Sequence, residues 1–172
     1  MTTDGHPGAA QPSVGLAVQG HPLVDRVTTV LAADALVPAV RAATAKQLVE
    51  RVRGPAPQVV ILGGPRSGAE RAADIRLVRE RLPDAVAVLV SSTPGGRGVR
   101  KALRAGATGF IFESEVEAAL AITVRAVAAG QVCIPSQLLH HTGQPALSAR
   151  EKQILGMVVL GFQNQEIAAK LH

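Results

Sequence analysis

The sequence predicts an α/β fold, in which a doubly wound five-stranded parallel sheet is followed by a short all-α segment. Two observations lead to this class. Residues 59–62 and 85–90 are apolar throughout, as expected for strands of a parallel sheet that helices cover on both faces. Short apolar runs of this kind alternate five times with helical stretches before Gly130, which is the order of a doubly wound βαβ fold.

The expected strands, in chain order, are residues 14–18, 36–42, 59–62, 85–90 and 109–112. Each is a short run rich in aliphatic and β-branched residues, a composition typical of strands. The second strand is the weakest of the five because it contains Pro38, which cannot donate a hydrogen bond to a neighbouring strand. We therefore expect the second strand at an edge of the sheet, or Pro38 at an end of the strand.

The expected helices are residues 23–34, 45–53, 69–81, 98–105 and 115–129. Their apolar residues recur every three or four positions, which is the period of one helical face. In the third helix, for example, Ile75, Val78 and Leu82 form one stripe and arginines lie elsewhere. Residues 1–12 are polar and rich in Gly and Ala, so we expect a disordered leader before a domain that spans residues 13–130.

A second unit is predicted after a linker. Residues 131–146 have a proline near each end and little periodicity, which is typical of a linker, with a helical turn expected near residues 135–140. From residue 147 to 172 the pattern is helical again. Ser148 and Glu151 have the spacing of a capping box, and Gly161 ends this helix before a second one that Asn164 caps.

Composition excludes several classes of protein. The net charge of +5 is compatible with binding to a polyanion, yet residues 1–130 hold 15 of the 18 basic and 11 of the 13 acidic side chains. The excess is therefore not concentrated in residues 131–172. No apolar run is long enough to span a membrane, and no signal peptide is expected, so the predicted location is the cytoplasm.

Chemistry of the enzymatic or metal-binding kind is not predicted. Cys133 is the sole cysteine, and it lies near His140 and His141 without the four-ligand spacing of a zinc site. No Gly-x-Ser-x-Gly nucleophile motif occurs. We therefore expect neither catalysis nor a bound cofactor.

Four segments carry a resemblance to a known family. Leu-Ser-Ala-Arg-Glu-Lys-Gln-Ile-Leu at residues 147–155 and Gly-Phe-Gln-Asn-Gln-Glu-Ile-Ala at 161–168 resemble the LuxR-type helix-turn-helix, with Gln163 departing from the usual small hydroxyl residue. His-Pro-Leu-Val at 21–24 and Gly-Ala-Thr-Gly-Phe at 106–110 resemble motifs of a receiver domain. Together they resemble a NarL/FixJ-type response regulator with a receiver (flavodoxin-like) domain. Such a regulator is expected to bind DNA as a homodimer.

The resemblance implies a DNA-binding segment that the chain carries only in part. In the family the base-reading helix follows the position of His172, and we expect about 25 further residues there from the geometry of the motif. Within the chain, Asn164, Gln165 and Lys170 are the candidates for contacts to the DNA backbone. The alternative is a helical hairpin used only for packing or dimerisation.

Receiver chemistry, by contrast, is predicted to be lost. The resemblance places the Mg²⁺-binding acidic pair on Gln19 and Gly20, the phosphoryl acceptor on Gly63 and the lysine on Glu113. The hydroxyl survives as Ser91 and the aromatic as Phe110. Phosphoryl transfer needs an acceptor carboxylate and a metal, and no Asp or Glu lies within residues 56–68 or 14–22 to restore them. We therefore expect a degenerate receiver that aspartate phosphorylation does not control.

Two further features suggest binding. Glycine-rich loops with an arginine follow two strands, and backbone N–H groups in such loops bind anions; the candidates are Gly64, Arg66, Ser67, Gly95, Gly96 and Arg97. The alternative is a pair of loops left over from a lost phosphate site. Residues Arg97, Arg100, Lys101 and Arg104 share one helical face, which is either solvated or suited to an acidic protein, a metabolite or DNA phosphate.

These expectations define one function and one alternative. The first is a DNA-binding transcription regulator that acts without aspartate phosphorylation. Its receiver-like domain would serve for dimerisation or would sense a small molecule or a protein. The alternative is a receiver-like protein-interaction module without specific DNA binding.

Overall fold

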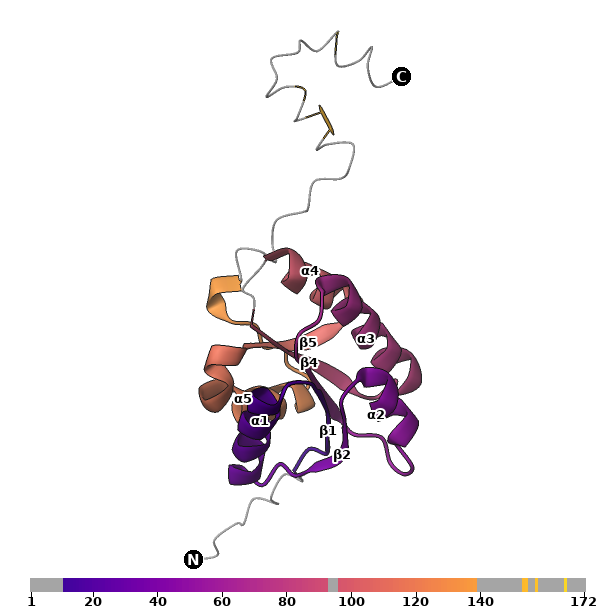
Figure 1. The fold of residues 1–172 in the computed structure, drawn as a ribbon, viewed down its shortest axis with the longest axis vertical. Coiled ribbons are helices and arrows are strands. Elements are labelled where there is room, and N and C mark those ends of the chain that lie inside the picture. Colours follow the sequence, from indigo (N-terminus) through magenta and orange to yellow (C-terminus); the bar gives the residue numbers. More distant parts are fainter. Residues whose placement is uncertain (1–10, 93–95, 139–152, 155–156, 158–165, 167–172) are drawn as a thin grey trace, which may run out of the picture. The chain divides into compact units, whose positions relative to one another are not determined.

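Five parallel strands form a single sheet in the computed structural model, which describes residues 11–92, 96–138, 153–154, 157 and 166 (Figure 1). The strands are β1 (Val14–Val18), β2 (Pro38–Ala42), β3 (Val59–Gly63), β4 (Val86–Ser91) and β5 (Ala107–Phe112), in the order β2-β1-β3-β4-β5. The helices are α1 (His21–Ala33), α2 (Ala45–Arg51), α3 (Gly68–Arg81), α4 (Gly96–Ala105) and α5 (Val116–Ala128), with short 3₁₀ helices η1 (Glu113–Glu115) and η2 (Ser136–Leu138). The predicted doubly wound sheet is confirmed, with each described boundary within two residues of the expected one.

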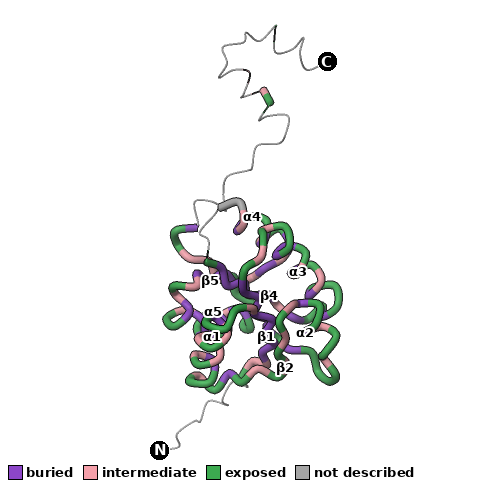
Figure 2. The backbone as a smooth tube through the Cα atoms, viewed as in Figure 1, coloured by how far each residue is buried: buried purple, intermediate pink, exposed green. Residues whose placement is uncertain are grey.

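Helices cover both faces of the sheet (Figure 1). Helices α1 and α5 pack on one face, and α2, α3 and α4 pack on the other. Alternate residues of β3 serve the two layers, because Val59 and Ile61 join the α1–α5 core whereas Val60 and Leu62 join the α2–α4 core. Buried residues accordingly fill β1 and β3 and most of β4 and β5, and exposed ones occupy the outer sides of the helices (Figure 2). This two-sided burial explains why the inner strands are apolar throughout.

Strand β2 lies at an edge of the sheet, as the proline in it predicts. Pro38 occupies its first position, where the missing N–H is least costly. Burial along β2 alternates between intermediate and exposed residues, unlike the fully buried β1 and β3. The weak sequence signal of this strand thus reflects its position in the sheet.

Residues after α5 extend the domain beyond the boundary expected at Gly130. Cys133 forms a bridge to Gly109 of β5, in which the Phe110 N–H donates to the Cys133 carbonyl at 2.9 Å and the Cys133 N–H donates to the Thr108 carbonyl at 2.9 Å. Helix η2 follows and buries Leu138 in the α2–α4 core. The first part of the expected linker therefore belongs to the compact unit of residues 1–142.

The C-terminal segment, residues 143–172, is a separate compact unit. Its described residues, Gln153, Ile154, Met157 and Glu166, are all helical. Residues 1–10 of the predicted leader and the caps Ser148 and Asn164 lie outside the described residues.

Candidate functional site

Residues predicted to form the former phosphorylation pocket meet at one edge of the sheet. Gln19 follows β1 and Glu113 follows β5, whereas Gly63 and Ser91 are the last residues of β3 and β4. Because all strands are parallel, these positions share the carboxyl edge. Gly63 lies opposite Val18 in the register, and the Gln19 N–H donates to the Gly63 carbonyl at 3.2 Å. The strands thus bring the predicted positions together, and Glu113 is the sole carboxylate among them.

Two other predicted positions have structural explanations. Gly20 is exposed at a φ of 93° and precedes the first turn of α1. Phe110 is buried in the α2–α4 core, where its ring meets that of Phe112 edge to face at a centroid distance of 5.7 Å. The backbone conformation of Gly20 and the burial of Phe110 are therefore sufficient to account for these residue types.

A tight turn closes the edge next to the former acceptor position. Gly64 has a φ of 110°, a conformation that L-amino acids with a side chain rarely adopt. A Cβ atom at Gly64 would lie 2.8 Å from the Cβ of Gln19 and 2.9 Å from its carbonyl oxygen. The β3–α3 loop therefore packs directly against Gln19. Glycine is required at position 64 both for its positive φ and for this close contact.

An arginine from α3 fills the centre of this edge. The Arg71 side chain is buried, with 7% of its surface exposed. Its Nη2 donates to the Gly64 carbonyl at 2.5 Å, its Nη1 to the Val90 carbonyl at 3.1 Å and its Nε to the Arg66 carbonyl at 3.1 Å. One guanidinium thus joins the β3–α3 loop to the end of β4, in the region where a receiver would hold a phosphoryl group.

The charges around Arg71 are consistent with this role. Burial lowers the pKa of Arg71, whereas the nearby Glu113 carboxylate and, to a smaller extent, Asp74 raise it. The guanidinium still keeps its proton, because arginine does not deprotonate in proteins. Glu113, at the position expected for the lysine, therefore supplies negative charge that favours the charged form of the buried Arg71 guanidinium.

The backbone of Glu113 is held by a contact between α1 and α5. The Arg26 Nη2 donates to the Glu113 carbonyl at 2.6 Å, while its Nε lies 2.5 Å from Oε1 of Glu117. The hydrogen bond from Arg26 lowers the pKa of Glu117 to about 2 and raises the pKa of Arg26. This ion pair places η1 at the edge of the sheet.

The β3–α3 loop uses its polar groups internally. Arg66 Nε lies 2.8 Å from Oδ2 of Asp74. Burial raises the pKa of Asp74, although the charge of Arg66 acts in the opposite direction. Ser67 and Glu70 form a capping box, in which the Ser67 N–H donates to the Glu70 carboxylate at 2.8 Å and the Glu70 N–H donates to the Ser67 hydroxyl at 3.3 Å. These hydrogen bonds lower the pKa of Glu70. Two of the predicted anion ligands are thus already engaged.

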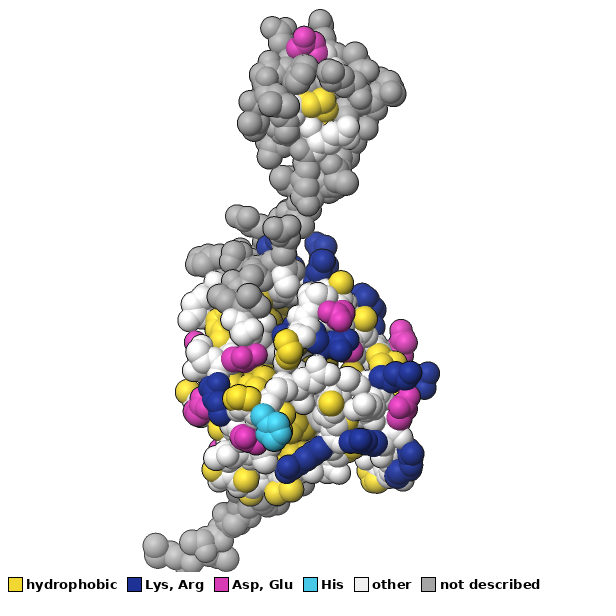
Figure 3. Space-filling model, in the orientation of Figure 1, with side chains coloured by type: hydrophobic (Ala, Val, Ile, Leu, Met, Phe, Trp, Pro, Cys, Tyr) yellow, Lys and Arg dark blue, Asp and Glu magenta, His cyan; other side chains and the backbone are white. Residues whose placement is uncertain are grey.

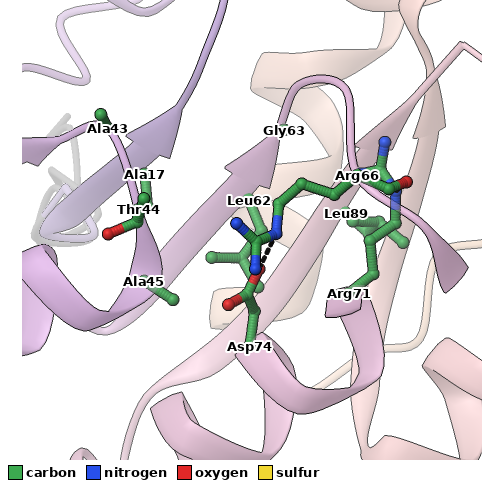
Figure 4. A pocket seen from close by; sticks show the side chains of 10 residues that line it. All are labelled: Ala17, Ala43, Thr44, Ala45, Leu62, Gly63, Arg66, Arg71, Asp74 and Leu89. Carbon is green, nitrogen blue, oxygen red and sulfur yellow. Dashed lines mark hydrogen bonds and ion pairs between the residues drawn. The ribbon is translucent and has the colours of Figure 1, made fainter. Parts of the chain in front are cut away.

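Little space remains beside these groups. The cavity next to Arg71 has a volume of about 10 Å³ and is lined by Ala17, Ala43, Thr44, Ala45, Leu62, Gly63, Arg66, Arg71, Asp74 and Leu89 (Figure 4). Such a volume holds about one water molecule. In Figure 4 the Arg66 side chain lies across this cavity toward Asp74. Of the second predicted loop, Gly95 lies outside the described residues, and Gly96 and Arg97 begin α4.

Arg71 was not identified from the sequence, although the sequence contains a signal for it. The residue lies four positions before Ile75 and seven before Val78, on the same buried stripe of α3. An arginine on a buried stripe needs hydrogen-bond acceptors, and those of Arg71 are carbonyls of the β3–α3 loop and of β4. What the sequence does not reveal is that the three carbonyls lie within reach of one guanidinium.

The candidate DNA-backbone residues Asn164, Gln165 and Lys170 lie outside the described residues, as do His140 and His141. Within the described part of the chain, no group of three His, Cys, Asp or Glu side chains is placed to hold a metal ion. No helix in that part is both long and apolar enough to cross a membrane.

Comparison with known sequences relates both ends of the chain to bacterial regulators. Residues 145–172 match the family described as bacterial regulatory proteins, luxR family. The transcriptional regulatory protein MctR of Rhizobium johnstonii is 29% identical over 165 residues, which cover 91% of this chain and 77% of MctR. The probable transcriptional regulatory protein SgaR of Hyphomicrobium methylovorum is 35% identical over 75 residues, which cover 42% of this chain and span only 36% of SgaR.

Comparison with solved structures concerns the fold. The RcsB response regulator of Salmonella typhimurium matches with a TM-score of 0.71 at 16% identity, over 94% of this chain and 84% of that one. A structure of two RcsB dimers bound to two parallel DNAs matches with a TM-score of 0.67 at 18% identity, over 94% and 83%. The receiver domain of the putative response regulator NarL of Mycobacterium tuberculosis matches with a TM-score of 0.62 at 20% identity, over 70% and 98%. At these identities the similarity establishes a receiver fold.

Proposed function

The chain joins a receiver-fold domain to a segment of the LuxR family of bacterial regulatory proteins, and on this premise we propose that it is a DNA-binding transcription regulator that acts without aspartate phosphorylation. Independence from aspartate phosphorylation is supported chiefly by the buried guanidinium of Arg71 at the carboxyl edge of the sheet.

The residue types at the expected pocket positions support the proposal that aspartate phosphorylation is absent. The positions expected to hold a metal are an amide and a glycine, Gln19 and Gly20, and the acceptor position is Gly63. Transfer to an aspartate needs a carboxylate at the acceptor position, and it needs a cation to neutralise the developing charge. The cation present is already bound to three carbonyls of the protein, and the adjoining cavity holds about one water molecule.

We propose that Arg71 connects the loop after β3 to β4 permanently. The guanidinium links the loop after β3 to Val90 in β4 without any covalent modification. The domain would then remain in one conformation, and its activity would depend on dimerisation, or on a small-molecule or protein ligand, instead of a kinase.

The proposed DNA-binding element is the C-terminal segment. Residues 145–172 match the LuxR family, and MctR and SgaR are both named as transcriptional regulators. We propose a homodimer because RcsB, which shares the fold, binds DNA as dimers. Asn164, Gln165 and Lys170 would contact the DNA backbone.

The test is DNA binding with and without a phosphoryl donor. Fluorescence anisotropy would measure the affinity of the full-length protein for duplex DNA, before and after incubation with acetyl phosphate and Mg²⁺. A response regulator that retains its acceptor aspartate serves as the positive control for the donor. We expect salt-dependent binding that the donor leaves unchanged. A change in affinity with the donor would overturn phosphorylation independence, and an absence of DNA binding would favour the protein-interaction alternative.

A further inference from the structure

Charge is divided unequally between the two helical layers of the domain. Helices α1, α5 and η1 carry four acidic and two basic side chains. Helices α3 and α4 carry eight basic and three acidic side chains. Figure 3 shows Lys and Arg side chains gathered over α2, α3 and α4. The positive charge of the domain is thus concentrated on the layer opposite to α1 and α5.

The basic side chains of the two layers also differ in their partners. Arg26 and Arg125 on the α1–α5 layer form ion pairs with Glu117 and Asp34 at 2.5 and 2.8 Å. On α3 and α4, five side chains make no hydrogen bond or ion pair with any residue in the described part of the chain, namely Arg76, Arg79, Arg81, Lys101 and Arg104. All five are exposed. Such a surface contains mutual repulsion that a bound anion would relieve.

Two of these side chains, Arg76 and Arg79, line a groove beside the last residue of α4. Together with the exposed Lys101 and Arg104 of α4 they form a basic surface, which we call the α3–α4 basic groove. The groove has a volume of about 360 Å³ and is lined by Arg76, Arg79, Glu80, Pro83 and Ala105. Arg79 lies over Gly106, since a Cβ added there would meet its Cδ and its guanidinium. The acidic Glu80 on the lining is outnumbered by the arginines.

Glycines bring the two helices close enough to form one surface. A Cβ at Gly68, the first residue of α3, would lie 3.7 Å from the Cα of Gly98 and 4.0 Å from Cδ of Lys101. At the other end of the two helices, Arg79 covers the turn that follows α4. Because Val99, Ala102 and Ala105 are buried, Lys101 and Arg104 belong to the exposed side of α4.

The surface fits phosphate better than it fits protein. Protein interfaces depend on apolar and aromatic anchors at their centre. The exposed large hydrophobic residues in the described part of the chain are Val37, Ile122 and Val132, and none of them belongs to α3 or α4. Phosphate contacts, in contrast, require only accessible cations and make binding strongly dependent on salt.

We propose that the α3–α4 basic groove is a second DNA-contacting surface, which binds the phosphate backbone without reading sequence. The inference rests on the proposed function, because it takes DNA as the partner of the chain. It would increase affinity and association rate equally for all DNA sequences, while any selectivity would come from the LuxR-type segment.

The experiment measures the affinity of the full-length protein for duplex DNA of arbitrary sequence across a range of salt concentrations. The test variant is R79Q/R104Q, and the matched control is R41Q/K46Q, which removes two exposed charges from β2 and α2. For the test variant we expect at least about a tenfold loss of affinity at low salt and a slope of log K against log salt reduced by about 2, since each phosphate contact contributes about 0.9. The control should retain the slope of the unmodified chain.

A third variant, N164A/K170A, separates this inference from the proposed function. If R79Q/R104Q binds like the control while N164A/K170A loses affinity, the second surface is refuted and the proposed function stands. If R79Q/R104Q loses affinity and N164A/K170A does not, the groove is supported and the role of the C-terminal residues fails. Competition by polyglutamate as strong as competition by DNA would refute the preference for phosphate. Thermal unfolding of each variant shows whether the fold is retained.

Discussion

Replacing Arg71 with methionine tests whether the buried guanidinium holds the carboxyl edge together. Methionine keeps much of the volume but leaves the carbonyls of Gly64, Arg66 and Val90 without their donors. A buried acceptor that loses its partner costs about 1–3 kcal/mol, and strand carbonyls retain part of their bonding through a second lone pair. Methionine also removes the cost of burying the guanidinium charge, which offsets part of the loss of stability. We therefore expect the free energy of unfolding to fall by about 2–4 kcal/mol.

Urea denaturation followed by circular dichroism measures this change. The matched control is Arg76→Met on the same helix, where the side chain is exposed and has no partner in the described residues, so a change below about 0.5 kcal/mol is expected. Arg71→Lys should recover less than half of the loss, because an ammonium cannot reproduce the planar three-way geometry. A stability for Arg71→Met within about 0.5 kcal/mol of the unmodified protein would refute the reasoning.

Three further perturbations probe the surroundings of the edge. Arg26 lowers the pKa of Glu117 from 4.5 to about 2, so the stability that the Glu117 carboxylate contributes is present above pH 4.5 and is lost as the pH falls toward 2. Urea titrations at several pH values should show that Glu117→Gln removes this part of the acid sensitivity. Gly64→Ala should lower stability by more than about 2 kcal/mol in the same assay, because it combines a φ of 110° with a clash against Gln19, and an unchanged midpoint would contradict the close approach. Ser67→Ala should cost about 1 kcal/mol by removing the cap of α3, and a neutral effect would argue against the capping box.

The sequence was sufficient to predict the sheet because its information is local. The runs at β3 and β4 are apolar throughout since both of their faces are buried, and Pro38 indicated the edge position of β2. The bridge between Cys133 and Gly109 was not predicted, because it depends on a contact between residues distant in sequence. No periodicity in a single segment can show such a pairing.

The lack of acidic residues at the expected pocket positions could be predicted from the sequence, but the side chain that occupies the edge could not. Because the strand ends fix which positions meet, the lack of acids at Gln19, Gly20 and Gly63 could be recognised without coordinates. What occupies the edge instead depends on a long side chain that reaches back from α3, and its three acceptors come from Gly64, Arg66 and Val90. The charge reversal at Glu113 acquires its explanation only when Arg71 is seen beside it.

Uptake of a phosphoryl group by the purified protein would distinguish a functional receiver from a degenerate one. The full-length protein would be incubated with acetyl phosphate and Mg²⁺ and its intact mass compared with that of an untreated sample, alongside a receiver that retains its acceptor aspartate. We expect the control to gain one phosphoryl group and this protein to gain none. A stoichiometric gain of mass that maps to the carboxyl edge of the sheet would contradict the account.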